Sequence, residues 1–174
     1  LNAVLFVGSS SIVGWDTEKW FSEMKTINRG FGGSYIVDSV YYADSIILPY
    51  KPKTIVFYAG DNDIADNKTP QMLLADFKVL VSVIRSSLPE TRIIVISTKP
   101  SIDRWKFWPK MQEANNLIRK YCKSQNEIFF VDVSKVMLDE TGNPRKELFK
   151  ADGLHINEKG YELWTSLVKP LIKK

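Results

Sequence analysis

The fold of this chain is decided by residues 4–12, which read VLFVGSSSI. Four apolar residues, two of them β-branched, run directly into a glycine and three serines. The pattern predicts a buried strand over residues 3–8 that ends in a tight turn with small hydroxyl side chains at its tip. Because open α/β folds bind their ligands at the carboxyl ends of the strands, we expect one of these serines to lie at a binding edge.

Apolar stretches of strand length recur along the chain and alternate with stretches of helical periodicity. Residues 54–59, TIVFYA, form the clearest further strand, and their continuous apolar character indicates burial on both faces of a sheet. Thr69 and Pro70 are typical of the N-cap and the first position of a helix, which we extend to Ser87. The other predicted strands are 25–28, 92–97 and 128–131, and the other predicted helices are 15–24, 36–47, 110–124 and 157–172. This alternation predicts one α/β domain with a parallel sheet covered by helices on both faces.

Composition excludes several classes of protein. The chain is 44% hydrophobic and 25% charged, as is ordinary for a soluble globular protein. Its net charge of +4 is spread along the chain, so we expect no nucleic-acid partner. No stretch approaches the length of a membrane-spanning helix. Because the chain begins at Leu1, a cytoplasmic protein and one exported after removal of an N-terminal segment both stay open, and the oligomeric state is not predicted.

The few metal-binding side chains argue against a metal centre. Cys122 is the only cysteine, so it forms no internal disulfide, and we interpret it as a buried, inert thiol on a helix. One cysteine and one histidine cannot supply a common zinc site. Asp61 and Asp63 flank Asn62, and we interpret these two carboxylates as groups that brace a loop. We therefore expect no metal centre.

The single histidine, His155, lies at the other end of the chain from the serines, in the sequence DGLH of residues 152–155. A serine hydroxyl is a weak nucleophile and needs a base, and an imidazole suits that role near neutral pH. Asp152 lies three residues earlier and can hold the imidazole in the required tautomer. In the simpler interpretation, Asp152 only opens a turn.

Acyl transfer also needs hydrogen-bond donors aimed at the developing oxyanion. The backbone N–H of Ser10, a glycine N–H and the side-chain amide of Asn62 are the candidates. Three glycines within residues 30–33 indicate backbone that approaches something closely, although their spacing is not that of a dinucleotide-binding loop.

These stretches together resemble the four sequence blocks of the SGNH hydrolases, also called the GDSL esterase/lipase family. Ser10 stands at the nucleophile position of residues 6–12, and Gly33 stands at the oxyanion glycine of residues 28–34. The blocks GDND and DGLH supply the oxyanion amide, the acid and the base, at Asn62, Asp152 and His155. Ser9 and Ser11 remain rivals of Ser10, and Gly32 remains a rival of Gly33. The chain departs from the family where Ser9 replaces the usual aspartate before the nucleophile.

The resemblance implies a fold and an activity. The fold is a flavodoxin-like, three-layer α/β/α sandwich with five parallel strands in the order 2-1-3-4-5, here as a single SGNH hydrolase-type esterase domain over residues 1–174. The activity is hydrolysis of a small-molecule ester through an acyl-serine intermediate, without metal or cofactor. Family substrates include acetylated sugars, lysophospholipids, short acyl esters and thioesters.

The loop of residues 98–109 is the candidate wall of the substrate pocket. Arg104 or Lys106 could hold an anionic group, and Trp105 or Trp108 could stack on a sugar face or line an acyl groove. The tryptophans could equally pin the loop to the protein body. The loop is too polar for a long lipid-binding lid, which favours short acyl groups such as acetyl on a carbohydrate. The alternatives are a non-catalytic carbohydrate- or ligand-binding module on the same fold and, less favoured, a flavin binder that would give Asp152 and His155 no role.

Overall fold

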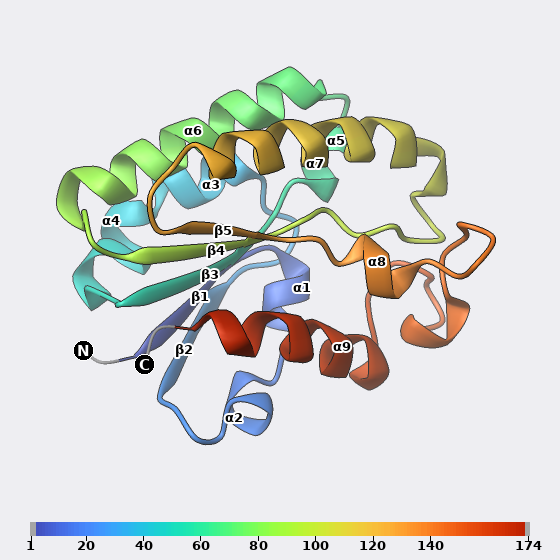
Figure 1. Cartoon of the computed structure of the whole chain (residues 1–174), viewed down its shortest axis with the longest axis horizontal. Coiled ribbons are helices and arrows are strands. Elements are labelled where there is room, and N and C mark those ends of the chain that lie inside the picture. The colour runs from blue at the N-terminus through green and yellow to red at the C-terminus, as the bar shows by residue number, and fades with distance from the viewer. Residues whose placement is uncertain (1–2, 173–174) are drawn as a thin grey trace.

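The computed structural model describes residues 3–172, which form a five-stranded sheet between two layers of helices (Figure 1). Leu1, Asn2, Lys173 and Lys174, the ends of the expected domain over 1–174, lie outside the described residues. None of the helices within residues 3–172 is both long and apolar enough to cross a lipid bilayer.

The sheet has the expected order. All neighbouring strands are parallel, and the order β2-β1-β3-β4-β5 confirms the flavodoxin-like prediction. The chain crosses from β1 to one side for β2 and to the other for β3, so ligands are expected beside the carboxyl end of β1. The strands are β1 (Val4–Gly8), β2 (Thr26–Gly30), β3 (Thr54–Tyr58), β4 (Arg92–Ile96) and β5 (Ile128–Val131).

Alternate residues of the strands enter two separate cores. In β1, for example, Leu5 and Val7 face one helical layer while Val4 and Phe6 face the other. The first layer contains α3 (Ile36–Tyr41), α4 (Ala43–Ile46), α5 (Asp61–Ala65), α6 (Pro70–Ser87) and α7 (Trp108–Lys123). The second contains α1 (Ser10–Val13), α2 (Thr17–Trp20), α8 (Ser134–Met137) and α9 (Glu158–Val168). Single 3-10 turns are η1 (Leu48–Tyr50), η2 (Trp105–Phe107), η3 (Lys146–Leu148) and η4 (Lys169–Leu171).

The long helices confirm the predictions, whereas the short ones depart from them. Thr69 caps α6 by accepting a hydrogen bond from the backbone of Met72. The predicted helix 15–24 shrinks to α2, because the chain turns at Phe21 to pack that ring against Phe6 and Trp15. The predicted helix 36–47 breaks into α3 and α4, and the predicted loops after β1 and β3 contain α1 and α5.

The end of β1 leaves no room for a side chain at Gly8. Gly8 has a φ of +142°, and a Cβ there would lie 1.8 Å from the carbonyl oxygen of Tyr58. The same carbonyl accepts the backbone N–H of Ser9 at 2.9 Å, and the carbonyl of Gly8 accepts the N–H of Phe31 at 2.9 Å. The ends of β1, β2 and β3 are therefore fixed to one another immediately before Ser10.

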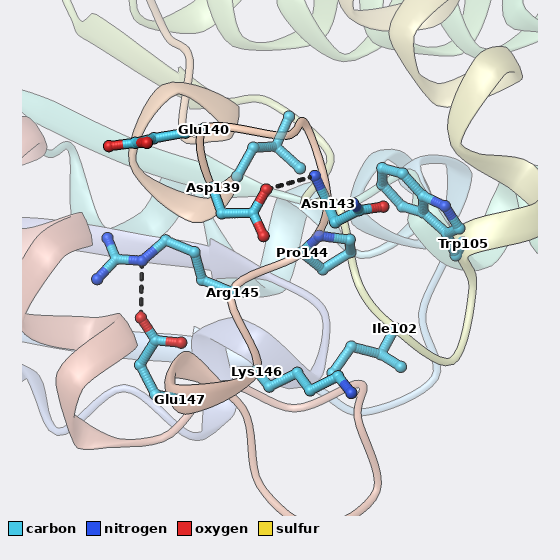
Figure 2. Close-up of a pocket in the computed structure, with 10 residues that line it drawn as sticks. Ile102, Trp105, Asp139, Glu140, Asn143, Pro144, Arg145, Lys146 and Glu147 are labelled. Atoms are coloured by element: carbon cyan, nitrogen blue, oxygen red, sulfur yellow. Dashed lines mark hydrogen bonds and ion pairs between the residues drawn. The ribbon is translucent and has the colours of Figure 1, made fainter.

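Two loops at this edge of the sheet enclose a groove of about 890 Å³ (Figure 2). Trp105 and Ile102 line it from the segment between β4 and α7, and Pro144 lines it from the segment that follows α8. Asp103, next to Ile102, donates its backbone N–H to the carbonyl of Gly153 at 3.1 Å. The groove therefore adjoins the loop of residues 152–155.

The substitution Gly8→Ala is expected to lower the free energy of unfolding by more than about 2 kcal/mol, because the new Cβ would force apart the ends of β1 and β3. Gly32→Ala is the matched control, since Gly32 has no positive φ and a Cβ there meets no atom within 4 Å; its effect should stay within about 1 kcal/mol. Urea unfolding followed by circular dichroism measures both. Equal midpoints for the two variants would contradict the close passage at Gly8.

Candidate active site

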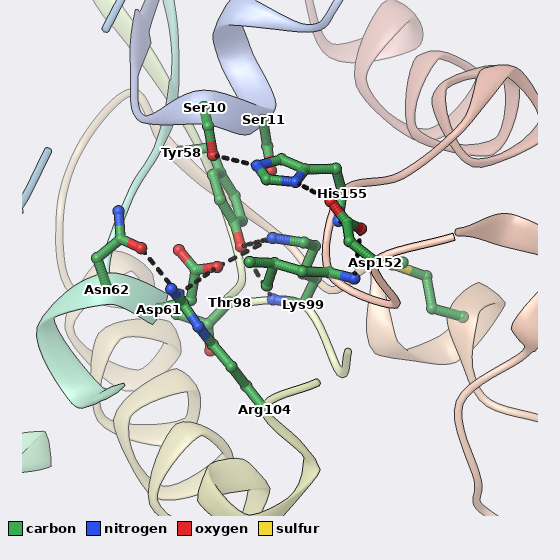
Figure 3. Close-up of polar contacts among 12 residues, drawn as sticks. Ser10, Ser11, Tyr58, Asp61, Asn62, Thr98, Lys99, Arg104, Asp152 and His155 are labelled. Carbon is green, nitrogen blue, oxygen red and sulfur yellow. Dashed lines mark hydrogen bonds and ion pairs between the residues drawn. The ribbon is translucent and has the colours of Figure 1, made fainter. Parts of the chain in front are cut away.

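Side chains from four separate segments meet at the carboxyl edge of the sheet (Figure 3). Ser10 begins α1 directly after β1, and Asn62 is the second residue of α5 after β3. Lys99 follows β4, and Asp152 and His155 lie in the loop before α9. Parallel strands bring these residues to one edge, as the sequence predicts for Ser10, Asn62, Asp152 and His155.

Ser10, His155 and Asp152 form a continuous chain of contacts. Nε2 of His155 lies 3.2 Å from Oγ of Ser10, and its Nδ1 lies 2.6 Å from Oδ2 of Asp152. An ionised carboxylate only accepts, so Asp152 favours the tautomer with the proton on Nδ1. The lone pair of Nε2 then faces the serine hydroxyl, which is the arrangement a general base requires.

The geometry separates Ser10 from its two rivals. Ser9 and Ser11 are each 1% exposed, and their hydroxyls have no hydrogen-bond partner within the described chain. Ser10 is half-buried, and its hydroxyl alone among the three contacts His155. Ser10 is thus the serine within proton-transfer reach of the imidazole.

Asp152 is held as a carboxylate by its surroundings. The hydrogen bond from His155 lowers the pKa of Asp152 most, and the backbone N–H groups of Leu154 and His155, both at 2.9 Å from Oδ1, lower it further. The pKa of Asp152 therefore lies well below its usual range. The carboxylate can support a positively charged imidazole over the whole neutral range.

The candidate oxyanion donors lie on three neighbouring segments. The N–H of Ser10 is at the first position of α1 and has no partner inside that helix. The side-chain amide of Asn62 donates to the carbonyl of Ser34 at 3.1 Å, which ties α5 to the loop after β2. Gly33 precedes Ser34 in that loop with a φ of +72°, and it is exposed, as is its rival Gly32.

Arg104 and Trp105, the two expected pocket residues, have different surroundings. Trp105 lines the groove and stacks on Trp108, with ring centroids 5.9 Å apart, so it both pins the loop and offers a surface. The guanidinium of Arg104 instead lies 2.8 Å from Oδ1 of Asn62 and 3.3 Å from Oδ2 of Asp61. The partners of Arg104 among the described residues are therefore two side chains of the site, those of Asn62 and Asp61.

A buried ionic cluster, which consists of Asp61, Lys99 and Arg104, adjoins Asn62 and was not predicted from the sequence. Nζ of Lys99 lies 2.9 Å from Oδ2 of Asp61 and 3.3 Å from the hydroxyl of Tyr58. Burial alone would raise the pKa of Asp61, but the positive charges of Lys99 and Arg104 outweigh it and lower the pKa. Burial, and then the charge of Asp61, raise the pKa of Tyr58 well above its usual value. No sequence pattern distinguishes a buried lysine such as Lys99 from the exposed lysines.

Asp63 has different partners from Asp61. Lys68 lies 3.1 Å from Asp63 and 2.7 Å from Asp76 of α6, and the N–H of Ile36 donates to Asp63. Both aspartates thus hold the loop through cations, as the loop-bracing interpretation expects. Among residues 3–172, no group of three or more histidine, cysteine, aspartate or glutamate side chains is placed to hold a metal ion. Burial raises the pKa of Cys122 to about 12, which keeps this thiol protonated and inert.

A comparison with models of protein families identifies the family that this sequence matches. The model of the GDSL-like Lipase/Acylhydrolase family matches residues 9–163. A search of curated proteins gave no match.

Solved structures share the fold at low sequence identity. A structure from Streptococcus pneumonia is 22% identical with a TM-score of 0.88, covering 99% of this chain and 85% of that chain. A GDSL-like lipase from Bacteroides thetaiotaomicron is 22% identical with a TM-score of 0.83, covering 97% and 86%. A mutant of an acetyl-xylooligosaccharide esterase from Geobacillus Stearmophilus is 14% identical with a TM-score of 0.78, covering 99% and 94%.

The carboxylate of Asp152 is expected to remain ionised down to about pH 3, because the pKa is lowered by its hydrogen bonds. The ¹³Cγ resonance of Asp152 should therefore show no change of the size that carboxyl protonation causes between about pH 3 and pH 8. In His155→Ala the largest of these causes is lost, so the resonance should begin to titrate at higher pH than in the wild type. Superimposable titration curves would show that the imidazole does not hold the carboxylate.

Proposed function

The chain belongs to the GDSL-like lipase/acylhydrolase family, and we propose that it is a serine ester hydrolase in which Ser10 carries the acyl group. Family membership supports a hydrolase of this class. The observation that carries the finer proposal is the contact of Ser10 with His155 across 145 residues of sequence, with Asp152 behind the imidazole. We also propose that residues 1–174 form a single esterase domain.

In the first half of the reaction, Oγ of Ser10 attacks the ester carbonyl while Nε2 of His155 takes its proton. The carbonyl oxygen becomes an oxyanion, which accepts hydrogen bonds from the N–H of Ser10, the N–H of Gly33 and the amide of Asn62. The imidazolium, stabilised by ionised Asp152, then gives its proton to the departing alcohol oxygen. The C–O bond of the ester breaks and leaves an acyl-serine.

In the second half, a water molecule attacks the acyl-serine and His155 removes one of its protons. The tetrahedral intermediate forms again and collapses, with the imidazolium returning the proton to Oγ of Ser10. The products are the carboxylic acid and the free enzyme. No step needs a metal or a redox cofactor, since the acid, base and donors are all side-chain or backbone groups.

The groove favours an ester with a polar alcohol part and a short acyl group. Trp105 offers an indole surface, and Asn143 and Lys146 contribute polar groups to the same lining (Figure 2). Aromatic surfaces with polar neighbours suit sugar rings, which combine apolar faces with hydroxyl edges. The similar fold of the acetyl-xylooligosaccharide esterase agrees with an acetyl group on a carbohydrate as substrate.

A panel of p-nitrophenyl esters and acetylated sugars, varied in acyl length, tests this function. Acetate and butyrate esters should be hydrolysed, and Ser10→Ala should lower kcat/KM by at least about 1000-fold because the acyl acceptor is lost. Ser11→Ala is the matched control and should change kcat/KM less than about threefold, since that hydroxyl is buried and makes no hydrogen bond to His155. Full turnover by Ser10→Ala would contradict Ser10 as the acyl acceptor, and absence of turnover by the wild type would leave a ligand-binding module on the same fold.

The pH profile provides a second test. Between about pH 4 and pH 9, the logarithm of kcat/KM should fall with a slope of one on the acid side, because a protonated imidazole cannot accept the proton of Ser10. The lowered pKa of Asp152 keeps that carboxylate charged in this range, so it adds no second proton to the slope. Hydrolysis rates from about pH 4 to pH 9 measure the profile. A flat acid limb or a slope of two would be inconsistent with His155 as the single titrating base.

A further inference from the structure

Arg104 contacts the one side-chain amide among the candidate oxyanion donors. Its Nη1 lies 2.8 Å from Oδ1 of Asn62 and 3.3 Å from Oδ2 of Asp61, and its side chain is only 18% exposed (Figure 3). A guanidinium has five donors and no acceptor. The contact therefore stabilises only the amide orientation in which the carbonyl oxygen of Asn62 faces Arg104.

We propose that Arg104 is a positioning residue that holds the amide of Asn62 with its N–H groups turned toward the oxyanion. This inference rests on the proposed esterase function. One N–H of Asn62 donates to the carbonyl of Ser34 at 3.1 Å, so the amide is held at its nitrogen as well as at its oxygen. The other N–H has no acceptor within the described chain, so it is available to a ligand.

The buried ionic cluster keeps the guanidinium in place. Oδ2 of Asp61 accepts a hydrogen bond from Lys99 and forms an ion pair with Arg104, and the Lys99 side chain is 1% exposed. Nζ of Lys99 also lies 3.3 Å from the hydroxyl of Tyr58, the last residue of β3. Because Asp61 directly precedes Asn62, the ion pairs of Asp61 hold the backbone next to Asn62, and Arg104 holds the side chain of Asn62.

The positive charge of Arg104 also strengthens Asn62 as a hydrogen-bond donor to the oxyanion. The guanidinium withdraws electron density through Oδ1 and makes the opposite N–H of Asn62 a stronger donor.

The main experiment compares Arg104→Met with Arg119→Met on an acetate ester. Methionine keeps an unbranched side chain but has no donor. Arg119 makes the same kind of contact, 2.7 Å to Oδ1 of Asn116, on the exposed side of α7, so it is the matched control. We expect Arg104→Met to lower kcat by about 10- to 100-fold with KM within about twofold, and Arg119→Met to change neither. A raised KM for an anionic ester with unchanged kcat would make Arg104 a pocket residue and overturn the inference.

The double variant shows whether Arg104 acts through Asn62. Asn62→Ala alone should lower kcat by about 100-fold or more. If Arg104 only positions that amide, adding Arg104→Met to Asn62→Ala should cause no further loss. Multiplied losses would show an independent role and overturn the inference. Arg104→Lys, which keeps a donor and the charge, should regain at least about threefold of the kcat lost in Arg104→Met, and no recovery would count against positioning.

A readout independent of turnover separates this inference from the proposed function. The side-chain amide signals of Asn62, identified by their loss in Asn62→Ala, should shift in the ¹H–¹⁵N spectrum of Arg104→Met and stay unchanged in Arg119→Met. Unshifted signals would overturn the positioning role even if the enzyme is an esterase. If the wild type hydrolyses no ester, the proposed function fails, and the amide signals still decide whether Arg104 orients Asn62.

Discussion

The close passage of backbone at Gly8 is the constraint on which the site depends. β1 ends between β2 and β3, and its last residue leaves no space beside the carbonyl of Tyr58. The hydrogen bond from Ser9 to that carbonyl then sets the direction in which α1 begins. Ser10 is therefore placed by backbone contacts of central strands, whereas its chemical partner His155 comes from a loop near the other end of the chain.

A second constraint holds the donor side of the site. This chain has Ser9 where its family usually has an aspartate, and the Ser9 hydroxyl is buried without a partner in the described chain. Asp61, the first residue of α5, provides ionic bracing through Lys99 and Arg104. Buried charges are costly unless they are paired, so such a cluster contributes more to a defined arrangement than to stability. The defined arrangement here is that of Asn62.

The sequence predicts the parts of this protein that depend on local periodicity and capping. The buried run of β3 and the helix opened by Thr69 and Pro70 are confirmed because each is stabilised mainly by its own pattern. The short helices were missed or misjudged because distant contacts decide them. Tyr161, for example, donates its hydroxyl to the carbonyl of Ser11, 150 residues away, at the base of α1.

The candidate site shows the same difference between features that local sequence patterns predict and features that distant contacts decide. The resemblance supplies Ser10, Asp152 and His155 because their spacing in sequence carries the chemistry. Arg104 was expected to face substrate, since a cation in a polar loop has no local signal for its partner. Only the three-dimensional neighbourhood of Asp61 and Asn62 identifies that partner. The residues proposed to act directly can thus be predicted from motifs, whereas the residue proposed to position one of them depends on which loops the fold brings together.

The groove extends this argument to specificity. Its lining comes from the loop of Ile102 and Trp105 and from residues 138–147, which lie outside the motif blocks that carry Ser10, Asn62 and His155. The loop nevertheless contacts the reactive edge directly, through the hydrogen bond from Asp103 to Gly153. The same loop contacts Asn62 through the side chain of Arg104 and lines the groove through Trp105. In the proposed reaction, a ligand that moves this loop would therefore disturb both the contact of Arg104 with Asn62 and the lining of the groove, and so would couple recognition of the alcohol part to catalysis.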